Sequence, residues 1–344
     1  MIYITILFVL LMFSRAKPKL NSKLFMLGIF VILLTTCFRS PFIGIDTMGG
    51  YYEDYKEVVA GTRLTWMEPA WEVINRISIV LGFGYQGVIA IAGLLTILPV
   101  ACVLTKVSDN RCLSLAIYYG MYFILYSFNL MRQMIAVSFA FLAIYHYTQK
   151  KWMYVALALC VGFLFHKTIL FALPLFIFVR LDMRYLTTVA ITLGSLLVGI
   201  MLPTQAFYSL TGRYSTNLSA TDSYSGFRSG ILFPAMMAML FSLFFLFITY
   251  FGYSRIKGDT WYRMALLGVI VMNLTLKLGQ GTRMVLYFSQ AQAVFLPRHL
   301  KSSRNLTNRR IVKCVYYLYL FVNFSRILLD QWDTLTPYMF FWQI

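Results

Sequence analysis

Residues 129–168 read NLMRQMIAVSFAFLAIYHYTQKKWMYVALALCVGFLFHKT, and this stretch contains the pattern on which the fold depends. Two apolar runs, near 133–148 and 152–165, are separated by a short gap that holds Lys150 and Lys151. Apolar runs of about this length predict helices that cross a membrane. A gap rich in lysine is typical of a cytoplasmic loop. The stretch therefore predicts two membrane-embedded helices joined on the inner side.

The outer ends of this stretch are positively charged as well. Arg132 precedes the first run, and His166 and Lys167 follow the second. Two successive crossings return the chain to the side from which it started, so these three residues should share the outer side. Cations at a membrane edge are costly and tend to be functional. Gathered on one face, they would form a site for an anionic molecule that arrives at the outer surface.

The rest of the chain repeats this alternation of apolar runs and polar gaps. Of its 344 residues 60% are hydrophobic and 12% are charged, whereas a soluble domain has roughly 25% charged residues. The predicted class is therefore all-α, a polytopic membrane bundle forming one transmembrane domain over residues 1–344, with about 12 transmembrane helices (10–13). The apolar runs lie near 1–14, 24–38, 77–104, 112–128, 133–148, 152–165, 168–179, 185–203, 231–251, 264–278, 284–296 and 311–329.

The distribution of charge predicts the orientation. With the N-terminus outside, the inner gaps hold most of the Lys and Arg residues and few of the acids, as cytoplasmic loops do. The net charge of +18 does not indicate nucleic acid, because the basic residues are scattered between spans; membrane lipids are the expected contacts. The outer side nevertheless holds Arg39, Arg132, His166, Lys167, Arg213, Arg228 and Arg283.

Two predicted outer loops are long enough to hold structure of their own. The first, about 39–76, is acidic and aromatic, and the second, about 204–230, is rich in Ser, Thr and Tyr. Aromatic rings beside hydroxyl and carboxylate groups suit the faces and hydroxyls of sugars. The alternative is a belt of Tyr and Trp at the membrane interface.

Neither a metal nor a cofactor is expected. The five cysteines lie in or beside apolar runs with no CxxC and no Cys/His cluster, and the acidic residues include no DxD pair. The N-terminal MIYITILFVLLMF has neither a basic start nor a small-residue cleavage site, so it is predicted to be a retained span rather than a signal peptide.

Two arginines are candidate anion-binding residues. Arg132 could mark a helix end by snorkelling, but outer helix ends normally avoid Arg, and its planar guanidinium suits bidentate contacts with phosphate. Arg283 follows an outer turn in which Gly279 and Gly281 would let the backbone approach a ligand closely.

Three residues are candidates for proton transfer. His166 lies between two apolar runs with almost no loop, where an imidazole can act as a general base or donate to an oxyanion. A satisfied structural histidine is the alternative. Asp46 and Glu68 are the carboxylates beside which Gly or Pro fixes the backbone, whereas Glu53 and Glu57 are predicted to form a solvated acidic face.

Several short motifs occur in an order that resembles a known family. They are GIDTMGGYYEDY, EPAWEVINRI, NLMRQMIAVSFAFLAIYHY, FHKTILFALPLF and TRMVLYF, across roughly residues 39–290. Their order and spacing resemble the EpsG family of bacterial exopolysaccharide proteins, which is related to Wzy-type O-antigen and capsule polymerases. The residues of this sequence that match the family's pattern are Asp46, Tyr51, Arg132, His166, Arg283 and Tyr287. Arg213 and Arg228 fall in a loop that matches nothing and are candidates by charge alone.

The resemblance implies a polymerase of lipid-linked oligosaccharide repeat units at the outer face of a bacterial inner membrane. The donor and acceptor would be glycans linked to undecaprenyl diphosphate, and a chain-length regulator protein is a further candidate partner. Cations would neutralise the departing diphosphate while a base takes the proton of the attacking sugar hydroxyl. Tyr51 and Tyr287 would contact sugar. An O-antigen ligase and a flippase for lipid-linked oligosaccharide are the alternatives.

Overall fold

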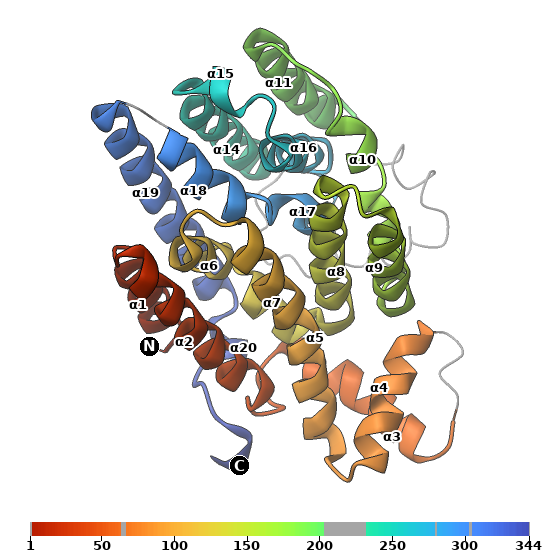
Figure 1. The fold of residues 1–344 in the computed structure, drawn as a ribbon. Coiled ribbons are helices and arrows are strands. Elements are labelled where there is room, and N and C mark those ends of the chain that lie inside the picture. The colour runs from red at the N-terminus through yellow and green to blue at the C-terminus, as the bar shows by residue number, and fades with distance from the viewer. Residues whose placement is uncertain (1, 63–66, 203–231, 279–280, 303–304, 344) are drawn as a thin grey trace. The chain divides into compact units, whose positions relative to one another are not determined.

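A computed structural model describes residues 2–62, 67–202, 232–278, 281–302 and 305–343 (Figure 1). In these ranges the regular secondary structure is helical, apart from an isolated β-bridge between Arg39 and Phe340. The prediction of an all-α chain is therefore confirmed for the described residues. Contacts divide the chain into two compact units, each of which is described by itself. A single transmembrane domain stays a prediction.

The first unit comprises residues 1–170, 296–298 and 314–344. Its N-terminal part begins with two antiparallel apolar helices and continues through a short π-helix into the region predicted as the first outer loop. Its helices are α1 (Ile2–Phe13), α2 (Pro18–Cys37), η1 (Thr47–Tyr51), α3 (Tyr52–Val59), α4 (Pro69–Val80), α5 (Gly84–Val107), α6 (Arg111–Gly120), α7 (Phe123–Asn129), α8 (Met131–Thr148), α9 (Trp152–Phe165), most of η2 (Lys167–Ala172), the larger part of α19 (Leu306–Asp330), α20 (Trp332–Leu335) and η4 (Phe341–Gln343).

The second unit comprises residues 171–295 and 299–313. Within it α11 and α14 pack against α16, and α17 packs against α16 as well. The helices are α10 (Leu175–Phe178), α11 (Tyr185–Met201), α14 (Leu232–Tyr250), α15 (Tyr253–Ile256), α16 (Thr260–Leu274), α17 (Gly281–Ser289) and most of α18 (Gln292–Ser302).

Apolar helices dominate both units. Among the described residues, α2, α5 and α19 are long and apolar enough to cross a membrane, and several shorter apolar helices accompany them. Large apolar side chains also remain exposed on the outside of single helices, as on α9, where Leu157 is 59% exposed. These features are consistent with a multi-pass membrane protein.

Four predicted runs are divided in the structure. The run near 168–179 becomes η2 and α10, and the run near 284–296 becomes α17 and α18. The other two break at residues with positive φ. The run near 77–104 begins inside α4 and continues as α5, because Gly82 and Gly84 adopt positive φ and turn the chain between the helices. The run near 112–128 becomes α6 and α7, which are separated at Tyr122, a residue in the left-handed region with φ 73°. Apolar composition predicted these two runs, but it carried no signal for their breaks.

Helices α8 and α9 form the predicted hairpin and run side by side (Figure 1). The inner face of α9 follows the 3–4 spacing of Val155, Ala158, Gly162 and Phe165, all of which are buried. Gly162 permits the close approach, since a Cβ there would lie 2.4 Å from the Ile169 side chain and 3.5 Å from the α8 backbone. The hairpin therefore has a rigid open end, formed by the start of α8 and the end of α9.

The segment predicted as the first outer loop folds onto this open end. Residues 47–59 and 69–80 form η1, α3 and α4, and their buried aromatic residues join a core with α5, α8 and α9. Trp71 is fully buried in this core beside Tyr51 and Tyr85. The loop predicted at about 39–76 is thus a packed helical layer in its described part.

The C-terminal segment closes the other side of the same loop. The Ser40 N–H donates to the Met339 carbonyl (2.9 Å), and the Gly44 N–H donates to the Thr334 carbonyl (3.0 Å). Gly44 has φ +101°, and a Cβ there would lie 2.6 Å from the Phe128 carbonyl, so the loop requires glycine at this point. Residues 334–340 and 38–47 therefore support each other.

Candidate functional site

The open end of the α8–α9 hairpin brings together residues that are distant in sequence. Arg132 is the second residue of α8, and His166 ends α9 in an extended conformation. Lys167 begins η2 directly afterwards. Because the two helices are antiparallel and joined by a tight turn at Gln149–Lys151, their far ends must meet. Glu68 approaches the same place from the start of α4.

Glu68 connects the parts of this cluster. Its Oε2 pairs with the Arg132 Nη1 at 2.9 Å, and its Oε1 accepts from the main-chain N–H of Lys167 at 3.2 Å. The Arg132 and Glu68 side chains are 21% and 12% exposed, so the pair is largely removed from solvent. Glu68 occupies the N-cap position of α4, yet its side chain does not cap that helix. The carboxylate instead binds Arg132 and the main chain at the start of η2.

The Arg132 guanidinium is held by few groups. It stands over the Tyr51 ring, 5.9 Å from the ring centre, where a cation–π attraction applies. Its contact with Glu68 uses one nitrogen rather than the two-nitrogen fork that arginine can offer a carboxylate or phosphate. The buried Nε has no hydrogen-bond partner within the part of the chain that the structure describes. The guanidinium therefore retains donor capacity.

His166 is oriented by the residue that follows Lys167. The Thr168 main-chain N–H donates to His166 Nδ1 (3.3 Å), and the Thr168 hydroxyl lies 2.7 Å from the same nitrogen. A main-chain N–H can only donate, so Nδ1 acts as an acceptor. The neutral imidazole must then carry its proton on Nε2. In this tautomer His166 offers a donor rather than a base.

Asp54 is a further acidic residue in this region that the sequence reasoning did not single out. It is 4% exposed, and its Oδ2 accepts from the Trp71 indole N–H at 3.1 Å. Burial raises the pKa of Asp54 to about 6, while the Trp71 hydrogen bond and the Arg132 charge act in the opposite direction. The signal was available as helical spacing, because Tyr51, Asp54 and Val58 share one buried face.

Arg39 has a different environment. The guanidinium is 1% exposed and donates to the carbonyls of Ile43 and Phe128 and to the Thr47 hydroxyl. Burial lowers the pKa of Arg39 to about 10, so it stays charged at neutral pH. Arg39 thereby organises the loop that contains Asp46, a half-buried residue directly before η1. Contact of Arg39 with a diphosphate stays a prediction.

Of the remaining predicted residues, Tyr51 borders the cluster: its ring lies against the Arg132 guanidinium and is buried against Trp71, with ring centres 4.9 Å apart. Arg283, half-buried, and Tyr287, fully buried, belong to α17 in the second unit, so their convergence with Arg132 stays a prediction. Arg213 and Arg228 fall outside the described residues.

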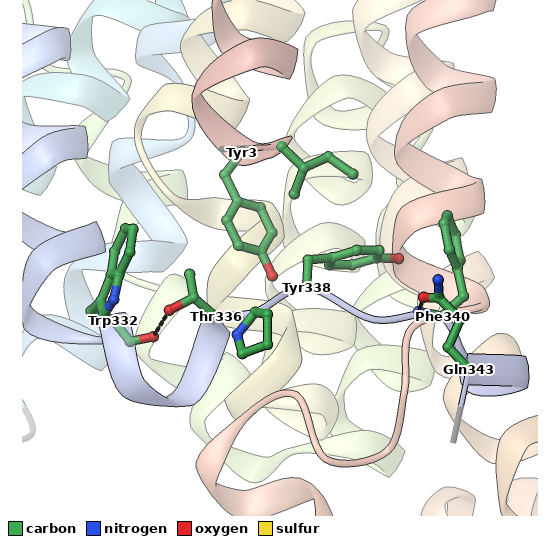
Figure 2. A pocket seen from close by; sticks show the side chains of 8 residues that line it. Tyr3, Trp332, Thr336, Tyr338, Phe340 and Gln343 are labelled. Atoms are coloured by element: carbon green, nitrogen blue, oxygen red, sulfur yellow. Dashed lines mark hydrogen bonds between the residues drawn. The ribbon is translucent and has the colours of Figure 1, made fainter.

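A hollow of about 700 Å³ lies at the C-terminal segment (Figure 2). It is lined by Ile2, Tyr3, Trp332, Thr336, Pro337, Tyr338, Phe340 and Gln343, none of which is charged. The hydroxyl groups at its wall are used internally: Tyr3 donates to the Leu335 carbonyl (2.9 Å) and Tyr338 to the Thr35 carbonyl (3.0 Å). The hollow offers aromatic surface but no cation for an anionic ligand.

Within the described residues, no group of three or more His, Cys, Asp or Glu side chains could hold a metal ion. The cluster of Glu68, Arg132, His166 and Lys167 has the groups that suit an anion and a proton transfer.

Comparison with known proteins identifies a family. The model of the EpsG family matches residues 2–340, nearly the whole chain. No curated protein and no solved structure matches the chain.

Proposed function

The chain belongs to the EpsG family, and from this premise we propose that it is a glycosyltransferase that polymerises lipid-linked oligosaccharide repeat units. Family membership suggests a membrane protein of exopolysaccharide biosynthesis. The finer proposal places the reaction at the outer face of a bacterial inner membrane, on glycans carried by undecaprenyl diphosphate. Its product would be an O-antigen, capsule or exopolysaccharide chain.

The reaction needs two kinds of protein group. A hydroxyl oxygen of the acceptor glycan bonds to the anomeric carbon of the donor, and the bond from that carbon to the phosphate oxygen breaks. Undecaprenyl diphosphate leaves with the bond's electrons, and the hydroxyl proton passes to a base. Positive charges and hydrogen-bond donors must therefore face the leaving diphosphate, and a base must face the hydroxyl. The donor already carries its leaving group, so no cofactor is required.

The observation that carries this proposal is the cluster at the open end of the α8–α9 hairpin. Arg132 and Lys167 supply positive charge there, and the tautomer of His166 supplies an N–H donor, which together suit a diphosphate. The base is then a carboxylate, and Glu68 is the one held against these donors. Arg39 would act as a positioning residue, while Arg283, Arg213 and Arg228 remain candidates for the second phosphate.

The proposal includes an orientation and a span count. We infer about 12 spans with the N-terminus outside, supported by the charge bias of the gaps. Cysteine labelling of intact cells at positions 223 and 302 tests this. Position 223 should react with an impermeant reagent and position 302 should not. The reverse result would put the cluster on the cytoplasmic side and end the proposal.

Reconstitution tests the activity itself. Purified protein in proteoliposomes should convert an undecaprenyl-diphosphate-linked repeat unit into a ladder of longer glycans and release undecaprenyl diphosphate. Transfer onto lipid A core alone would identify a ligase. Movement of the unchanged donor across the bilayer without glycan growth would identify a flippase. Either of these outcomes would replace the polymerase assignment.

A further inference from the structure

The Glu68 carboxylate occupies the place where the proposed reaction requires the donor's diphosphate to bind. Its two carboxylate oxygens contact Arg132 Nη1 at 2.9 Å and the Lys167 main-chain N–H at 3.2 Å. Phosphate oxygens accept hydrogen bonds from both kinds of donor, the guanidinium and the main-chain N–H. A carboxylate that bridges a guanidinium and a main-chain amide resembles, in charge and in spacing of oxygens, one face of a phosphate. The protein therefore supplies its own anion to this cluster.

Three observations distinguish this arrangement from a permanent structural ion pair. The guanidinium engages Glu68 through one nitrogen only, and its buried Nε has no partner among the described residues. The Glu68 side chain contacts Arg132 and the Lys167 N–H and makes no capping hydrogen bond to α4. By contrast, Glu72 on the same helix pairs locally with Arg76, using both Nη2 and Nε of that arginine. Arg132 has unused capacity that a second, better matched anion would employ.

We propose that Glu68 occupies the phosphate subsite of the donor lipid and is displaced when the donor's diphosphate binds. This inference rests on the proposed function. The diphosphate would take the Arg132 guanidinium and the Lys167 N–H, because a phosphate presents more oxygens and more charge than a carboxylate. The carboxylate and the diphosphate repel each other at one guanidinium, and the diphosphate also takes the Lys167 N–H that Glu68 uses, so Glu68 leaves as the donor enters.

The displaced carboxylate then has a task in the reaction. Away from Arg132, Glu68 is an acceptor-only group near the anomeric carbon of the bound donor. It takes the proton of the attacking acceptor hydroxyl while the oxygen bonds to the anomeric carbon and undecaprenyl diphosphate departs. The proton passes to water when Glu68 returns to Arg132. The donor must therefore bind first, since the base is released only by its diphosphate.

Binding and turnover should respond to Glu68 in opposite directions. Glu68→Gln removes the competing charge, so undecaprenyl diphosphate should bind the variant about 3–10-fold more tightly than the wild type. The same variant lacks the base, so polymerisation should fall about 10²–10⁴-fold. Glu72→Gln is the matched control, because it neutralises an acid one turn further along α4, and it should change neither quantity. Arg132→Ala should weaken binding.

The measurement uses full-length protein in nanodiscs with undecaprenyl diphosphate as the probe. Inorganic pyrophosphate as competitor reports the contribution of the head group, and phosphatidylglycerol reports non-specific attraction of anionic lipid. A preference for undecaprenyl diphosphate over phosphatidylglycerol, displaced by pyrophosphate, supports a diphosphate subsite. Equal binding of both lipids would identify a general lipid contact and overturn it.

The possible failures are separable. Wild-type protein that neither binds undecaprenyl diphosphate nor makes polymer would end the proposed function, and the displacement with it. Wild-type protein that binds and polymerises, beside a folded Glu68→Gln variant that binds equally or more weakly, would overturn the displacement alone. Size-exclusion profiles and circular dichroism establish that the variant is folded. Glu68→Asp provides a second variant, which keeps the charge and should not gain affinity.

Discussion

Arg39 and Arg132 are both predicted to lie on the outer side, but the structure holds them in opposite ways. Arg39 is 1% exposed and is bound by main-chain carbonyls, a hydroxyl and the Phe128 ring. Arg132 has a 21% exposed side chain and one described ion-pair partner, the Glu68 carboxylate that we propose is displaced by the donor's diphosphate. In the sequence both are cations next to an apolar run. The structure thus separates two arginines by burial and by the kind of partner, a difference that the charge pattern does not reveal.

The largest effects should come from replacing each of the two arginines, in separate variants, by alanine. Arg39→Ala removes a large buried side chain and its hydrogen bonds to the Ile43 and Phe128 carbonyls, which then share the Thr47 hydroxyl as a donor. We therefore expect a loss of about 3–5 kcal/mol in stability and little folded protein. Arg132→Ala should remain folded and lose activity. Thermal unfolding in detergent and the reconstituted polymer assay separate the two outcomes. Arg76→Ala, at an exposed ion pair, is the control for both. An Arg39→Ala protein that unfolds at the wild-type temperature would contradict the structural role of Arg39.

His166 tests whether the Arg132 region acts as a donor site. His166→Ala should lower polymerisation about 10²–10³-fold, the usual effect of removing one donor to a developing charge. His166→Gln keeps an N–H and should retain part of the activity, whereas a histidine acting as base would lose it in both variants. His146→Ala, in which the lost ring stacks on Tyr154, should give normal chain lengths. Full-length polysaccharide from His166→Ala cells would remove His166 from the mechanism.

Arg132→Lys tests whether the shape of the arginine side chain matters in addition to its charge. Lysine keeps the positive charge but replaces the planar fork with a point charge. Loss of one charged hydrogen bond corresponds to about tenfold in kcat/KM. Arg39→Lys should instead appear as reduced stability, since one ammonium cannot reach the same carbonyls. Wild-type kinetics for Arg132→Lys would argue against bidentate contact with phosphate.

Asp54 should affect stability rather than activity, and the effect depends on pH. Because its folded-state pKa, about 6, lies above the usual 3.8, the folded protein favours the protonated form. The associated stability is present below pH 4 and is lost as pH rises through about 6. Asp54→Asn keeps an acceptor for Trp71 without the charge, so it should stabilise the protein by roughly 2 kcal/mol at pH 8 and by little below pH 4. Thermal unfolding at pH 8, 6 and 4 measures this; a gain independent of pH would contradict the assignment.

The sequence was sufficient for some parts of this architecture. Apolar runs predicted helix class, and the lysine gap at 150–151 predicted the α8–α9 hairpin that brings Arg132 and His166 together. The break at Tyr122 escaped detection because left-handed backbone at a tyrosine depends on tertiary packing.

Within the site, residue identity was easier to predict than residue partnership. Glu68 was selected because Pro69 fixes its backbone, but its ion pair with Arg132 joins segments 64 positions apart and depends on how α4 docks. Asp54 was passed over as one acid among several, although its spacing from Tyr51 placed it on the buried face. Partners across the fold leave no local trace in a single sequence.

The hydrogen bonds between residues 334–339 and the segment after α2 have a consequence for how the chain is made. Ser40 and Gly44 are synthesised long before Met339 and Thr334, to whose carbonyls their N–H groups donate. The segment after α2 therefore cannot complete these hydrogen bonds until the ribosome has produced residue 339. A chain cut short before residue 334 would present this unfinished edge to the proteases that survey new membrane proteins. Completion of these hydrogen bonds thus requires that synthesis has passed α20.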